Sequence, residues 1–139
     1  MTPRVPRDEE GSILLLTIGY ALLAIVALLV CVNATSLYLA QKRLDSVADA
    51  AALAGADGFT ISLTGDWPRA DLTDDGVRDQ AAAIVTEIGQ GAVLVSAGTP
   101  DGASARVTVA GAWHPPVFTL FVPDGVALES TATSRTALQ

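Results

Sequence analysis

A long run of apolar side chains at residues 13–32 is the strongest pattern in the sequence. These twenty residues, ILLLTIGYALLAIVALLVCV, carry no charge. As a helix rising about 1.5 Å per residue, they would span the roughly 30 Å hydrocarbon core of a bilayer. A cleavable signal peptide is the competing interpretation, because short residues precede Thr35. The apolar region of such signals is usually about 7 to 15 residues long, so the pattern favours a retained transmembrane helix at residues 12–33.

The helical pattern continues beyond this run. After Val32 there is no proline or glycine before Gly55, and apolar residues keep recurring three and four positions apart. The helix is therefore predicted to reach about Ala56, with residues 34–58 as an extension outside the bilayer. Alanine has the highest helix propensity, and its small side chain lets a neighbouring helix or sheet approach closely. The predicted helix-packing interface consists of Leu44, Val47, Ala48, Ala51 and Ala54.

Two aspartates flank this apolar stripe. Asp45 and Asp49 lie one helical turn apart, but the nearby sequence offers neither a third metal ligand nor a partner for acid–base chemistry. We expect them to form a solvated edge, with Lys42 in reach of Asp45.

Shorter elements are predicted for residues 59–139. Residues 59–72 are mixed and predict a strand fragment or loop. Thr73, followed by two aspartates and then apolar residues at helical spacing, predicts an N-capped amphipathic helix ending at Gly89. Strands are predicted at residues 92–97, 105–113 and 126–135. The apolar residues 117–122, VFTLFV, are compatible with a buried strand, with lipid contact or with contact to another subunit.

These elements predict an α+β fold. A long N-terminal transmembrane helix continues into a small domain with one further helix and an antiparallel sheet of about three strands, which the Ala-rich helix would cover. The expected organisation is a short cytoplasmic N-terminus at residues 1–11, the transmembrane helix at 12–33, the helix extension at 34–58 and an extracytoplasmic domain at 59–139. Two basic residues lie on each side of the apolar run, so the positive-inside rule does not set this orientation. We prefer it because the anchor would then serve as its own export signal.

The net charge and the small number of reactive side chains argue against several classes of function. The net charge is −7, and residues 45–139 hold four arginines against twelve carboxylates, which argues against nucleic acid as a partner. Cys31 and His114 are the only residues of their types. Neither a nucleophile motif such as GxSxG nor a phosphate-binding GxxxxGK[ST] loop is present. We expect no enzymatic activity, metal, cofactor or small-molecule substrate.

The segment around the alanines resembles a known family. A Gly-Ser step into an apolar run, then Arg43-Leu44 and the string ADAAALAGA at residues 48–56, is similar to the N-terminal region of TadG-like (TadE/TadG) Flp pilus-assembly proteins. The ending STATSRTA at residues 130–137 is similar to the last strand of such proteins. The resemblance implies a pilin-like protein of the bacterial cell membrane, in the minor pilin or pseudopilin class of the tight-adherence secretion system. The implied partners are the lipid bilayer and other Tad/Flp pilus-assembly proteins.

The same resemblance raises the question of processing. Pilins and TadE-type pseudopilins are cut by a prepilin peptidase after a glycine and usually carry glutamate five residues on. Gly11 and Ser12 offer the cleavage position here, but the fifth residue is Leu16, so an uncut anchor is our first expectation.

Two functions remain from the sequence. The first is a single-pass structural component of Flp-type pilus assembly or secretion that acts by helix packing and protein contacts. The alternative is a membrane-anchored extracytoplasmic binding or sensor module unrelated to pili.

Overall fold

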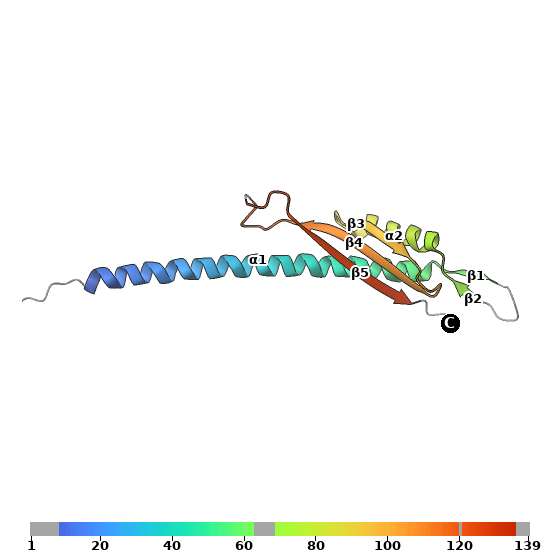
Figure 1. The fold of residues 1–139 in the computed structure, drawn as a ribbon, viewed down its shortest axis with the longest axis horizontal. Coiled ribbons are helices and arrows are strands. Elements are labelled where there is room, and N and C mark those ends of the chain that lie inside the picture. Colours follow the sequence, from blue (N-terminus) through green and yellow to red (C-terminus); the bar gives the residue numbers. More distant parts are fainter. Residues whose placement is uncertain (1–8, 63–68, 120, 136–139) are drawn as a thin grey trace, which may run out of the picture. The chain divides into compact units, whose positions relative to one another are not determined.

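A computed structural model describes residues 9–62, 69–119 and 121–135 (Figure 1). The described elements are α1 (Glu9–Asp57), β1 (Thr60–Ser62), β2 (Arg69–Asp71), α2 (Asp74–Ile88), β3 (Val93–Gly98), β4 (Ser104–Trp113) and β5 (Val126–Arg135). The chain divides into two compact units, residues 1–35 and residues 36–139.

The described part of the first unit is the N-terminal portion of α1. Its large apolar side chains are exposed, and α1 is the one described helix long and apolar enough to cross a bilayer. Two polar side chains here donate within the helix: the Thr17 hydroxyl to the Ile13 carbonyl and the Asn33 amide nitrogen to the Leu29 carbonyl, both at 2.8 Å, while the buried Asn33 Oδ1 has no hydrogen-bond partner. Such local bonding suits a helix in lipid, where water is not available as a partner.

The second unit combines the rest of α1 with α2 and a three-stranded antiparallel sheet. The strand order is β3-β4-β5, and β4 pairs with β5 in unbroken register from Ser104↔Arg135 to Trp113↔Val126. The α+β fold expected from the sequence is confirmed. The predicted last strand agrees with β5 in both bounds, and the other two predicted strands lie within one residue of β3 and β4.

The second helix begins as its sequence predicts. The Thr73 side chain accepts a hydrogen bond from the Gly76 amide at 3.2 Å, and Asp74 and Asp75 occupy the first turn, where carboxylates oppose the positive end of the helix dipole. The helix ends at Gly89, and Gly91 then takes a φ of 97°, a backbone conformation that favours glycine.

The structure defines the conformation of two segments for which the sequence pattern left more than one interpretation open. Residues 59–72 include a small hairpin, in which β1 and β2 pair antiparallel, while residues 63–68 lie outside the described part. The described residues of 117–122 form turns and no strand. This removes the buried-strand interpretation, because prolines at 115, 116 and 123 interrupt the pairing that β4 and β5 would otherwise extend.

One hydrophobic core joins the elements of the second unit. Its members come from α1, α2, the three-stranded sheet and the connection between β2 and α2: Leu44, Val47, Ala48, Ala51, Ala52, Ala56, Leu72, Val77, Ala81, Val85, Ala97, Ala105, Val107, Val109 and Ala132. Figure 1 shows this part of α1 running along the sheet, with α2 beside β3. The small residues of α1 thus pack against the chain's own domain.

Candidate helix-packing interface

The candidate interface is the side of α1 that faces the sheet. Leu44, Val47, Ala48 and Ala51 are buried, the two alanines completely, whereas Ala54 is half-buried. The buried set also includes Ala52, Gly55 and Ala56, which widens the stripe beyond the residues singled out from the sequence. Buried residues lie both before and after Ala51 in the sequence, because residues three and four positions apart share one face of a helix.

Gly55 is a point of close approach between α1 and its neighbours. A Cβ atom there would lie 2.9 Å from Val77 Cγ1 of α2 and 3.3 Å from the Ala105 Cβ of β4. In the sequence, Gly55 only marks the end of the stretch without proline or glycine, but it lies four residues after Ala51 within α1 and continues the small-residue spacing. That spacing is the signal that could have identified it as a packing residue.

A polar cluster ties α1 to β5 beside this stripe. The Asp45 carboxylate accepts hydrogen bonds from the Ser130 hydroxyl at 2.8 Å, the Gln41 amide at 3.0 Å and the Lys42 ammonium at 3.2 Å. The Gln41 amide also donates to the Glu129 carbonyl of β5 at 3.2 Å. The expected Lys42–Asp45 pair is present, but Asp45 is more than a solvated edge, because its bond to Ser130 joins residues 85 positions apart.

These hydrogen bonds set the acid response of Asp45. The Ser130 hydroxyl, followed by Gln41 and Lys42, lowers the pKa of the Asp45 carboxyl from its ordinary 3.8. Because the folded pKa lies below the unfolded one, the associated stability is present at neutral pH. It is lost as the pH falls below about 4 and through the folded pKa.

Asp45→Asn is therefore expected to destabilise the second unit by about 1 kcal/mol at pH 7, since it weakens charge-assisted bonds at a partly exposed site. Denaturant unfolding of the detergent-solubilised chain would measure this, and the difference from the wild type should shrink as the pH falls below about 4 and through the folded pKa. Asp49→Asn, at the exposed aspartate one turn later, is the matched control and should be silent. An equal loss in both variants at neutral pH would contradict the role assigned to Asp45.

At the other end of the sheet, carboxylates close turns. Asp101 accepts from the amides of Ala103 and Ser104 and from the Ser104 hydroxyl at 2.6 to 3.0 Å. The Ala103 amide is the largest cause lowering the pKa of the Asp101 carboxyl. Asp74 likewise accepts from the Thr99 amide at 2.7 Å. Asp101 is therefore explained by its turn, whereas Asp74 joins the start of α2 to the residue after β3.

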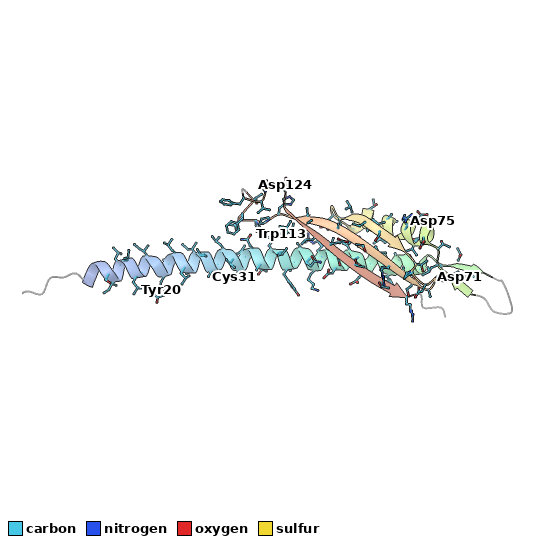
Figure 2. The ribbon with its side chains drawn as sticks, in the orientation of Figure 1. Tyr20, Cys31, Asp71, Asp75, Trp113 and Asp124 are labelled. Carbon is cyan, nitrogen blue, oxygen red and sulfur yellow. The ribbon has the colours of Figure 1, made fainter. Side chains whose placement is uncertain are left out.

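A further hydrogen bond fixes the opposite end of β4. The Trp113 indole N–H donates to the Ser36 hydroxyl at 3.0 Å, so the last residue of β4 is held at the first residue of the second unit. Tyr38 lies on the same stretch of α1, with the Lys42 ammonium 5.9 Å from its ring centroid. Figure 2 shows Trp113 and Asp124 at this end of the sheet, with Asp71 and Asp75 at the far end.

The other reactive or metal-binding side chains of the described residues lie apart from one another. Within the described ranges, no group of three or more His, Cys, Asp or Glu side chains could hold a metal ion. Cys31 and His114 are both exposed, and His114 borders an open cavity of about 340 Å³ that Arg43 and Leu44 also line. Gly11 and Ser12, the possible cleavage position, lie inside α1.

The fold and the interface define a small α+β domain built on the C-terminal part of a long N-terminal helix. Residues 11–58 match the family model described as putative Flp pilus-assembly TadE/G-like. The resemblance found in the sequence is thus confirmed for this N-terminal region, and it supports involvement in Flp pilus assembly. No curated protein and no solved structure matches the chain.

Proposed function

We propose that this protein is a single-pass, membrane-anchored structural component of Flp/Tad-type pilus assembly, in the class of minor pilins or pseudopilins. The observation that carries the proposal is the family match over residues 11–58, which begins near the start of α1 and ends one residue after it. Within this proposal the protein works by helix packing and protein contacts. Its short N-terminus lies in the cytoplasm and its domain lies outside.

The two parts of α1 have different roles in this proposal. The buried side chains at residues 44–56 of α1 pack into the domain's own core, so they hold the domain on this helix. The apolar side chains of residues 13–32 are exposed to their surroundings, and they are available to lipid and to the helices of other pilus-assembly proteins. Partner helices would pack there through shape and small residues, since lipid removes the hydrophobic drive for association.

A deletion of the gene in its own bacterium tests the function. Surface Flp pili, counted by electron microscopy, should be lost and then restored by the wild-type chain. As a control, the deletion strain would also be complemented with the Ser46→Phe chain. This substitution lies at an exposed position on α1 and leaves the core intact. Unchanged pili in the deletion strain would refute the proposal.

Processing gives a separate expected result. Mass spectrometry of the N-terminal peptides of the membrane-extracted chain should show the bond between Gly11 and Ser12 intact. The reason is that Leu16 stands where substrates of the peptidase usually carry glutamate. A start at Ser12 would make the protein a processed pseudopilin, and a start at Thr35 would mean that residues 13–32 act as a signal peptide.

A further inference from the structure

The connection between β4 and β5, residues 114–125, presents apolar side chains to its surroundings. Phe121 is 81% exposed, the highest value for a large apolar side chain among the described residues, and Val117 and Phe118 are also exposed. The Phe118 and Phe121 rings lie edge to face with centroids 6.2 Å apart. Residues 115–123, PPVFTLFVP, contain no charge. An apolar surface of this kind marks a contact with a partner or a membrane.

Chain connectivity places this loop close to the end of the apolar run. Trp113, the residue before the loop, is bonded to Ser36, and Ser36 stands four residues after Val32. Four residues reach about 14 Å when fully extended and about 6 Å as a helix. The headgroup layer on each side of the hydrocarbon core is itself about 5 to 8 Å thick. The base of the loop therefore lies at or just above the headgroups, whatever the arrangement of the two units.

The side chains around this point are those typical of a membrane surface. Trp113 belongs to the indole class that concentrates at membrane–water interfaces, and Tyr38 is 61% exposed on α1 two residues after Ser36. Lys42 lies over the Tyr38 ring, where a long cationic side chain can reach phosphate groups. The titratable residues of the loop itself are His114 and Asp124.

We propose that the described residues of the loop from Pro116 to Thr119, with Phe121, dock into the headgroup region of the same bilayer that holds α1, Phe121 being the most deeply inserted described side chain. The inference rests on the membrane anchor of the proposed function and adds a second contact between the protein and lipid. The domain would then be held at a fixed height above the bilayer, with Asp74, Asp75 and Asp101 at the end of the sheet away from it.

Depth-dependent quenching on the full chain tests the docking. In a Cys31→Ser background, Phe121→Cys would carry an environment-sensitive nitrobenzoxadiazole label, and the chain would be reconstituted into phosphatidylcholine/phosphatidylglycerol vesicles. Lipids spin-labelled near the headgroup should reduce its fluorescence, and its emission should shift to the blue. Ile61→Cys is the matched control, since Ile61 is an apolar residue, 63% exposed, in β1 beyond the far end of α1. Its fluorescence should not change.

Each other outcome overturns the inference in a distinguishable way. An unquenched label at position 121 in a chain that resists carbonate extraction refutes the docking and leaves the anchor intact. Extraction of the chain by carbonate refutes the anchor and the docking together. A blue shift that appears only at high protein density, with disulfide formation between unlabelled Phe121→Cys chains, assigns the loop to a second copy instead of lipid.

Discussion

Ala51→Phe is expected to unfold most of the second unit while leaving the helix at residues 13–32 in place. Ala51 is fully buried in the core between α1 and the sheet, and a phenylalanine there adds six heavy atoms to a side chain that is already completely enclosed. Overpacking typically costs about 1 to 3 kcal/mol, and a ring at a completely buried alanine belongs at or above the upper end. Hydrogen exchange of the β3–β5 amides, followed by mass spectrometry on the chain in detergent, should show lost protection.

The matched control is Ser46→Phe, which introduces the same side chain at an exposed position five residues before Ala51 on α1. Its β-strand amides should exchange as in the wild type. If both variants behaved alike, close packing of α1 on the sheet would not be what holds the domain together. The same pair of variants extends to the pilus assay, where Ala51→Phe should fail to restore pili.

The second large effect is expected at Gly55 and depends on one neighbour. Gly55→Ala gains about 1 kcal/mol of helix propensity, but its Cβ would lie 2.9 Å from Val77 Cγ1. Valine is stiff about χ1 and fully buried here, so it cannot move aside. The net result should be a destabilisation of about 1 to 2 kcal/mol, measured by denaturant unfolding.

A double-mutant cycle isolates this clash. Val77→Ala removes Cγ1, so Gly55→Ala should become neutral or stabilising in that background, with a coupling of about 1 kcal/mol or more. Gly111→Ala serves as the control, because its Cβ would meet Leu44 Cδ1 at an ordinary 3.5 Å. Simple additivity of the Gly55 and Val77 changes would disprove the contact between α1 and α2.

The sequence predicts the elements well because each depends on local patterns. Apolar spacing predicted α1 and α2, the Thr73 cap predicted where α2 begins, and alternation with turn residues predicted the strands. One feature of the interface depends instead on which residues meet across the fold. The bond between Asp45 and Ser130 requires the helix to lie at a particular register on β5, and no local pattern reports that register.

Two further points illustrate the same limit. The importance of Gly55 as a packing residue depends on Val77, 22 positions away, and in the sequence glycine near a helix end first indicates a stop. The apolar string at residues 117–122 has the composition of a strand, yet the prolines on both sides and the pairing of Trp113 with Val126 leave it outside the sheet. Its exposure is therefore a property of the tertiary structure.

The position of the boundary between the two units determines what a proteolytic cut there would release. Every member of the core lies at or after Leu44, and the Trp113 bond is made to Ser36, so the folded domain takes no core residue from the first 35. A cut before Thr35 would release a body with its interior complete, whereas a chain left whole keeps the same body tethered. The domain would therefore keep the same fold whether the chain stays anchored or is cut at this boundary. A protease acting there would change the location of the domain without changing its structure.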